Sequence, residues 1–285
     1  FYFLLNLVLY PLEILLKLLY KKKIDKTNKI IVIFGNYASS TTLIMQIIVT
    51  NTKVNYINNI SSKLFLCPCL GQFINKIIFF LFKPVSNYYS NDGITNGYLE
   101  PSEFGWFWRN FFWKNKKINT TKFDEMMKIF TDNKYKNFLF KYCMHDKNRD
   151  LLANFNFFRN LKKNFIFIYP YRKKQLVVNS ILNRRKNLNN YKSSYKLNLK
   201  KKKINLAINK QVEEIYKEHA LFLKKFDKSQ IYRISYEKMK KNRDSEIKKL
   251  FSFLKLNDIK IIEGKEIRKN LSKISYKPDI KKIKL

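Results

Sequence analysis

A short loop rich in hydroxyl groups is the first feature of the sequence able to carry chemistry. Gly35 follows the apolar run of residues 30–34, and four hydroxyl residues stand before a second apolar stretch of helical length: Ser39, Ser40, Thr41 and Thr42. Backbone amides at a helix N-terminus, together with hydroxyl groups, bind anions such as phosphate. The Gly-Lys-Ser/Thr ending of a Walker A loop is absent. The loop therefore predicts an anion cradle, and a simple Ser/Thr cap of the helix is the alternative.

Two further segments place polar side chains after apolar runs. Arg172 and Ser180 stand eight residues apart behind the run at 165–169, and Tyr236 follows the run at 231–235. A guanidinium offers a forked set of donors to a phosphate dianion, and a serine hydroxyl at the following helix can reach the same group. The alternatives are a basic residue near a helix start and an aromatic residue at a strand end.

Together these segments resemble the sulfotransferase family. Gly35 to Leu43 read GNYASSTTL, against GxPRSGTTLL or YPKSGTTW in the family's 5′-phosphosulfate loop. Arg172 and Ser180 have the spacing of the family residues that bind the 3′-phosphate of 3′-phosphoadenosine 5′-phosphosulfate (PAPS). Residues 236–239 (YEKM) and 253–256 (FLKL) take the places of its YEDL and FLGL motifs. The resemblance covers about residues 30–256.

The resemblance implies a P-loop-like fold and a metal-free transfer of a sulfuryl group from PAPS to a hydroxyl of a saccharide, lipid or small molecule. The cofactor-binding residues that it implies are Gly35, Ser39, Ser40, Thr41, Thr42, Arg172, Ser180, Tyr236 and, by its basic character near the C-terminus, Arg268.

The loop departs from the family at two positions. Ala38 stands where the family has Arg or Lys, and Ser40 stands where it has Gly. The family's basic residue stabilises charge on the leaving oxygen, a contribution that is costly to lose. Either another cation replaces it, with Lys163, Arg109 and Lys174 as candidates, or catalysis is weak or absent. The second case leaves open a degenerate protein of this fold that binds a nucleotide or partner.

The general base that would deprotonate the acceptor hydroxyl is expected in the segment before the apolar run at 165–169. Acidic residues are scarce in the chain, and the candidates are Asp92, Glu100, Glu103 and His145, the last beside Asp146. Glu100 and Glu103 are spaced to share one helical face, or to begin a helix as its acidic first turn. The aromatic run at 106–113 forms either a stacking wall for the acceptor or core.

The elements that must position these residues alternate along the chain. Runs at 30–34, 165–169 and 231–235 have the length and composition of buried strands, and each precedes a helical pattern. This order predicts an α/β fold with a central parallel sheet flanked by helices. Residues 29–285 are expected to form one domain, with a helical and aromatic insertion at about 55–160.

The N-terminal segment, residues 1–28, predicts an amphipathic helix. Asn6, Tyr10, Glu13, Lys17 and Lys21 line one face, and Pro11 is expected to begin the regular helix. Charged residues disfavour a membrane span, and no cleavable signal is recognised. Attachment of residues 1–23 to an anionic membrane surface and packing on the domain remain equal alternatives. A cytoplasmic, or peripheral membrane, protein is expected.

Composition supports few further conclusions. The 285 residues hold 58 Lys and Arg against 21 Asp and Glu, a formal net charge of +37. The lysines are spread along a chain rich in Asn, Ile, Phe and Tyr, which is typical of an AT-rich genome, so a nucleic-acid partner is not expected. A basic membrane- or nucleic-acid-associated protein is the remaining alternative. Cys67, Cys69 and Cys143 suggest a reducing compartment, and their spacing with His145 disfavours a metal site.

Overall fold

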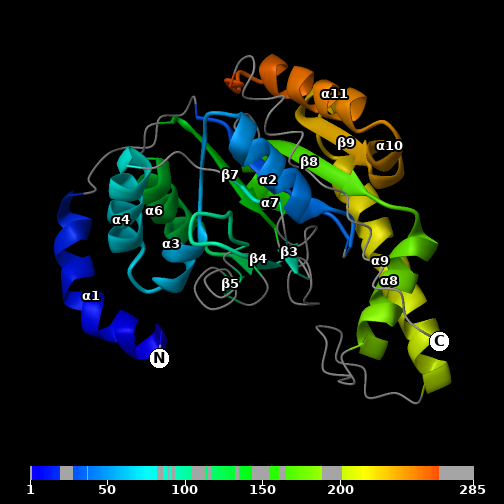
Figure 1. Ribbon diagram of the computed structural model, residues 1–285, viewed down its shortest axis with the longest axis horizontal. Coiled ribbons are helices and arrows are strands. Elements are labelled where there is room, and N and C mark those ends of the chain that lie inside the picture. Colours follow the sequence, from blue (N-terminus) through cyan, green and yellow to red (C-terminus); the bar gives the residue numbers. More distant parts are fainter. Residues whose placement is uncertain are drawn as a thin grey trace.

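Five parallel strands form the centre of the fold (Figure 1). The computed structural model describes residues 2–19, 28–36, 38–81, 86–88, 90–91, 94–103, 105, 113–114, 117–131, 135–142, 155–160, 165–187 and 201–262. In sheet order the strands are β2 (Val54–Tyr56), β7 (Asn137–Lys141), β1 (Ile30–Ile33), β8 (Phe165–Tyr171) and β9 (Ile231–Ser235). The predicted α/β architecture is therefore confirmed, and the three expected strands are β1, β8 and β9.

The segment at about 55–160, expected as an insertion, contributes to the sheet itself. It supplies β7, which lies between β2 and β1, and most of β2. It also holds two short hairpins, β3 (Ser90–Asn91) with β4 (Ile94–Thr95) and β5 (Trp113–Lys114) with β6 (Lys117–Ile118). The middle of the chain is thus part of the central architecture as well as an addition to it.

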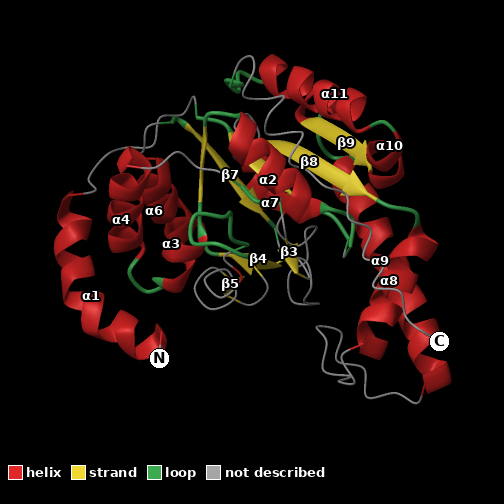
Figure 2. Cartoon of the chain, in the orientation of Figure 1, coloured by secondary structure: helices red, strands yellow, loops and turns green. Residues whose placement is uncertain are grey.

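Helices cover both faces of the sheet, which is why its central strands are apolar without alternation (Figure 2). Ile30 and Val32 pack toward α6 (Thr120–Thr131), α7 (Phe155–Asn160) and the end of α9 (Lys201–Leu223). Ile31 and Ile33 pack toward α2 (Thr41–Asn51), α10 (Tyr236–Lys241) and α11 (Arg243–Leu256). The two clusters hold β1 rigidly, and with it the start of the loop that follows.

The remaining helices lie at the two ends of the sheet. α8 (Lys174–Asn187) packs along α9, and Figure 1 shows this pair projecting beyond β8. A 3-10 turn at Lys228–Gln230 leads into β9. α3 (Asn59–Lys63) and α4 (Pro68–Leu81) lie at the opposite end, where α1 (Tyr2–Leu19) packs on α4 (Figure 1).

One expectation about the N-terminal helix was wrong. Pro11 lies inside α1, which runs from Tyr2 to Leu19, and so does not begin the helix. Asn6 and Glu13, two members of the expected polar face, are fully buried, whereas most apolar residues of α1 are exposed. Of the residues that the structure describes, none belongs to a helix long and apolar enough to span a bilayer.

Candidate functional site

The loop between β1 and α2 closes on itself at the carboxyl edge of the sheet. Ser39 Oγ donates a hydrogen bond to the carbonyl oxygen of Asn36 at 2.5 Å. Ala38 and Ser40 have φ angles of 57° and 70°, in the left-handed region. Ser40 thus occupies a backbone conformation that favours glycine, the residue that the family carries there. Although Ser40 differs from the family's glycine in residue type, its backbone has the conformation that glycine favours.

Gly35 has no room for a side chain. A Cβ there would lie 2.7 Å from the carbonyl oxygen of Pro170 on β8 and 2.7 Å from Ser39 Oγ. The first of these neighbours is backbone in the core of the sheet and cannot move aside. Glycine is therefore required for the loop to leave β1 against β8.

The first turn of α2 lacks a side-chain cap. Its N-cap residue, Ser40, makes no capping hydrogen bond through its side chain, so the alternative of a Ser/Thr cap does not describe this helix. Thr41 and Thr42 are buried in the first turn. Amides at a helix start that lacks a side-chain cap, together with the helix dipole, favour an anion at this place.

Lys141, which the sequence pattern did not single out, brings a cation to the loop. It ends β7 and pairs in register with Ile33, the last residue of β1. Its Nζ lies 2.8 Å from Thr42 Oγ1 and forms an ion pair with Glu103, and the residue is 5% exposed. The start of α2 therefore has a buried ammonium group beside Thr42, although Ala38 itself is neutral.

The two predicted glutamates lie in a turn and the loop after it, not on a helix face. Glu103 pairs with Lys141 and is a quarter exposed. Glu100 is buried and accepts hydrogen bonds from Gln46 Nε2 on α2 (3.0 Å), Ser86 Oγ (2.7 Å) and the amide of Asn87 (2.6 Å). The structure places Glu103 beside the loop and Glu100 one helical turn farther along α2.

Arg172 brings a second positive charge to the loop, on the other side of β1 from Lys141. It follows β8, and its Nη1 donates to the carbonyl oxygen of Ala38 at 3.1 Å. Its guanidinium carbon lies 4.5 Å from the ring centroid of Tyr236, the first residue after β9. Its Nε is buried and donates no hydrogen bond. The sequence thus correctly grouped the loop, Arg172 and Tyr236 at one edge.

Contacts from α9 and α10 hold the backbone around Arg172 in place. Tyr216 Oη on α9 donates to the carbonyl oxygen of Arg172, and the amide of Lys173 donates to Glu237 at 2.8 Å. Burial alone would raise the pKa of Glu237, but the Lys173 amide, further hydrogen bonds and the charge of Arg172 lower it overall. The carboxylate therefore stays ionised and anchors the segment that carries Arg172.

Of the other predicted residues, two lie on α8 and five lie outside the described residues. Ser180 is half-buried in α8, about 9 Å along the helix axis from its first residue. Lys174, a candidate replacement cation, pairs at the surface with Glu213 on α9 at 2.9 Å. The positions outside the described residues are Asp92, His145, Arg268, Lys163 and Arg109.

A metal site finds no support where the chain is described. No cluster of three His, Cys, Asp or Glu side chains occurs in the described ranges. Cys67 and Cys69 are buried free thiols, and burial raises the pKa of Cys67 to about 11 and raises that of Cys69 as well. They remain protonated at neutral pH and behave as small core residues. Cys143 lies outside the described residues.

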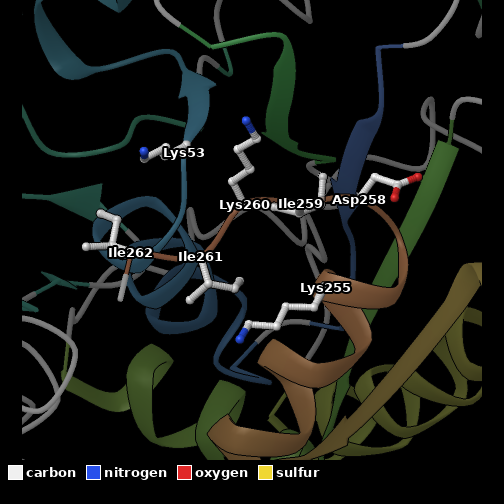
Figure 3. A pocket seen from close by; sticks show the side chains of 7 residues that line it. All are labelled: Lys53, Lys255, Asp258, Ile259, Lys260, Ile261 and Ile262. Atoms are coloured by element: carbon white, nitrogen blue, oxygen red, sulfur yellow. The ribbon is translucent and has the colours of Figure 1, made fainter. Parts of the chain in front are cut away.

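A surface hollow of about 660 Å³ lies at the opposite edge of the sheet, where β2 begins (Figure 3). Figure 3 shows that the ammonium groups of Lys53, Lys255 and Lys260 point in different directions instead of toward one point. The hollow therefore lacks the convergent donors of an anion site. The loop edge, with Lys141 and Arg172 flanking a helix N-terminus, is the better candidate.

Comparison with known proteins finds similarity to sulfotransferases. Residues 142–278 match the sequence model of the sulfotransferase domain. The fold matches the crystal structure of the sulfotransferase STF1 from Mycobacterium tuberculosis H37Rv, with a TM-score of 0.52 and 9% identity, over 87% of this chain and 72% of that chain. No curated protein matches the chain. The loop after β1 lies outside the matched sequence, so its assignment depends on the fold and geometry.

Proposed function

We propose that this chain, in which residues 142–278 match the sulfotransferase domain, transfers a sulfuryl group from PAPS to a hydroxyl group of a saccharide, lipid or small-molecule acceptor. The observation that carries the proposal is the contact of Lys141 Nζ with Thr42 Oγ1. It supplies positive charge at the loop although Ala38 is neutral. The same contact argues against the degenerate alternative, which was motivated by Ala38 alone.

The described residues fit the anionic groups of the donor. The start of α2 lacks a side-chain cap, which suits close approach of a phosphosulfate to its backbone amides, and Gly35 lets the loop that carries these amides pack against Pro170 on β8. Arg172 has a buried Nε that donates no hydrogen bond, and we assign it to the 3′-phosphate. Tyr236, against the Arg172 guanidinium, is assigned to the adenine.

PAPS supplies the sulfuryl group, and the bond between its sulfur and the bridging oxygen breaks as a bond to the acceptor oxygen forms. Lys141 provides a fixed positive charge beside Thr42, where negative charge develops on the leaving oxygen. Glu103, the partner of Lys141, is the carboxylate nearest to this point and accepts the acceptor proton.

Glu100 has a different part in this proposal. Its three donors come from α2 and from residues 86 and 87, so its carboxylate is already committed to holding this segment against α2. We assign it to positioning Glu103, which stands three residues later. The Glu103→Gln variant should therefore lower kcat with little change in donor affinity, whereas Glu100→Gln should also loosen the fold.

Calorimetry with adenosine 3′,5′-bisphosphate tests donor binding separately from transfer. Wild type should bind, and Arg172→Ala should bind at least about tenfold more weakly because a charge-assisted pair is lost. Lys249→Ala, at a lysine of α11 paired with Glu246, is a matched control for loss of one positive charge. Absence of binding by the wild type, or equal weakening by the control, would contradict the proposal.

Transfer itself is tested with labelled PAPS and a panel of hydroxyl acceptors. The wild type should transfer sulfate, and Lys141→Met should not, although it still binds adenosine 3′,5′-bisphosphate. A protein that binds the nucleotide but transfers only after Ala38→Lys would instead be the degenerate alternative. These outcomes separate the two functions whichever hydroxyl compound is the natural acceptor.

A further inference from the structure

The N-terminal helix is built with its polar side chains inward. Asn6 and Glu13 are 0% exposed, whereas Val8 is 76% and Leu4 66% exposed. In a helix on the surface of a water-soluble domain the opposite arrangement is the rule. The buried polar side chains of α1 therefore need hydrogen-bond partners inside the molecule, and its apolar side chains are left facing outward.

The cause is a set of hydrogen bonds that fixes the rotation of α1. Glu13 accepts from the amides of Cys69 (3.1 Å) and Leu70 (3.0 Å) in the first turn of α4, where the helix dipole favours a carboxylate. Asn6 Nδ2 donates to the carbonyl oxygen of Lys63 at 2.8 Å, and Asn6 Oδ1 accepts from the amide of Leu66 at 2.9 Å. Rotating α1 would leave these buried groups unpaired.

The consequence is a large apolar surface at one end of the molecule. Fourteen of the nineteen exposed large hydrophobic residues in the described ranges lie on α1 and α4. We name this set the α1–α4 surface; its members are Tyr2, Phe3, Leu4, Leu7, Val8, Tyr10, Leu12, Ile14, Leu15, Leu18, Phe73, Ile77, Phe80 and Leu81. Figure 1 shows α1 at the outer edge, with α4 between it and the sheet. Such concentrations of exposed apolar side chains mark sites of interaction.

The charged residues near the α1–α4 surface indicate what kind of partner binds it. Residues 2–19 and 59–81 contain one acidic residue, the buried Glu13, and three lysines: Lys17, Lys63 and Lys76. A second copy of the chain would bring lysines together with no exposed acid to meet them. An anionic bilayer accepts both features, because apolar side chains enter the acyl boundary while lysines reach the headgroups. Tyr2 and Tyr10, both exposed, are suited to that interface.

We propose that the α1–α4 surface binds the face of an anionic lipid bilayer, with α1 lying in the plane of the membrane. Asn6 and Glu13 serve as the internal anchors that keep the apolar residues directed outward. The proposal is independent of the sulfotransferase assignment, since none of its residues belongs to the loop edge.

Vesicle flotation of the 285-residue chain tests the proposal. Wild type should float with vesicles of phosphatidylcholine plus phosphatidylglycerol, and bind phosphatidylcholine vesicles more weakly. Val8→Glu should reduce the partition coefficient by about tenfold or more, because it removes buried apolar area and adds a charge to the interface. Leu206→Glu on α9 is the matched control, since Leu206 is 75% exposed against 76% for Val8. The control should float like wild type.

Two further measurements make the result decisive. Lys17→Glu keeps the apolar face and should weaken binding to anionic vesicles more than binding to phosphatidylcholine vesicles. Val8→Glu should keep wild-type helicity and urea unfolding because Val8 points outward. The proposal is overturned if wild type does not float, or if Leu206→Glu loses binding as Val8→Glu does. It is also overturned if light scattering shows a wild-type dimer that Val8→Glu dissociates while neither protein binds vesicles.

Discussion

Replacing Lys141 with methionine is the sharpest test of the candidate active site. Methionine retains an unbranched side chain of similar length and removes the ammonium group. Lys141 is 5% exposed, and its Nζ contacts Thr42 Oγ1 at 2.8 Å and Glu103. The substitution therefore removes one cation from the loop while leaving the backbone of β7 in place.

The expected effects on catalysis and on stability differ in size. Loss of one preorganised group that stabilises developing charge costs about 10²–10³ in kcat. Breaking a fully buried ion pair costs about 3–5 kcal/mol of unfolding free energy. Glu103 is 24% exposed and water can reach its carboxylate, so we expect a smaller loss of about 1–2 kcal/mol here.

A double-mutant cycle separates these effects. Lys141→Met, Glu103→Gln and the double variant are compared by urea unfolding and by transfer of labelled sulfate. The double variant should regain most of the lost stability, because no charge is left without its partner, and should not regain kcat. Lys249→Met, which removes a lysine 2.9 Å from Glu246 on α11, controls for the loss of any ion pair.

The reasoning would be refuted by a Lys141→Met enzyme whose kcat stays within about threefold of wild type while it folds normally. It would also be refuted by a double variant that recovers activity together with stability. In that case Lys141 would serve only to neutralise Glu103, and the cation at the leaving oxygen would have to come from another residue.

Three further outcomes follow from the loop and the core. Gly35→Ala should lower the unfolding free energy by about 1–3 kcal/mol and abolish nucleotide binding measured by calorimetry, because the added Cβ would lie 2.7 Å from the Pro170 carbonyl oxygen. Unchanged binding would contradict the assignment of this loop to the donor. Ser40→Gly should change the free energy of unfolding in urea by no more than about 1 kcal/mol, because relief of the left-handed strain at φ 70° offsets the added freedom of the unfolded chain. A larger loss would contradict the strain argument. Burial lowers the pKa of His219 to about 3, below its ordinary value, so the unfolded chain alone takes up this proton as pH falls from about 6.5 to about 3. The unfolding free energy of wild type should fall over that range by up to about 1.4 kcal/mol per pH unit more steeply than that of His219→Phe, and equal slopes would disprove it.

Three strands could be predicted because their apolar runs are continuous and each ends at a recognisable loop. β2 and β7 could not be. β2 is three residues long and has Asn55 at its centre, and β7 offers only the run FLF between Asn137 and Lys141 inside an aromatic-rich segment. Short runs of this kind carry too little periodicity to separate a strand from core or loop.

The N-terminal helix shows a different limit. Its periodicity correctly placed Asn6 and Glu13 on one face, because spacing determines which residues are neighbours. Spacing does not determine whether that face is turned to water. That choice depended on partners far away in the chain, the backbone groups of Lys63, Leu66, Cys69 and Leu70.

The neutral residue at position 38 has the same kind of explanation. A search along the sequence for a replacement cation considers residues near the loop in the chain, or near its presumed neighbours. The sheet instead places β7 and β8 on either side of β1, and each ends in a basic residue, Lys141 in register with Ile33 and Arg172 after β8. Arg172 uses the carbonyl oxygen of Ala38, so that residue contributes through its backbone. Positive charge therefore reaches the loop through strand order and register, which makes the identity of the side chain at position 38 less restrictive than the loop sequence alone suggests.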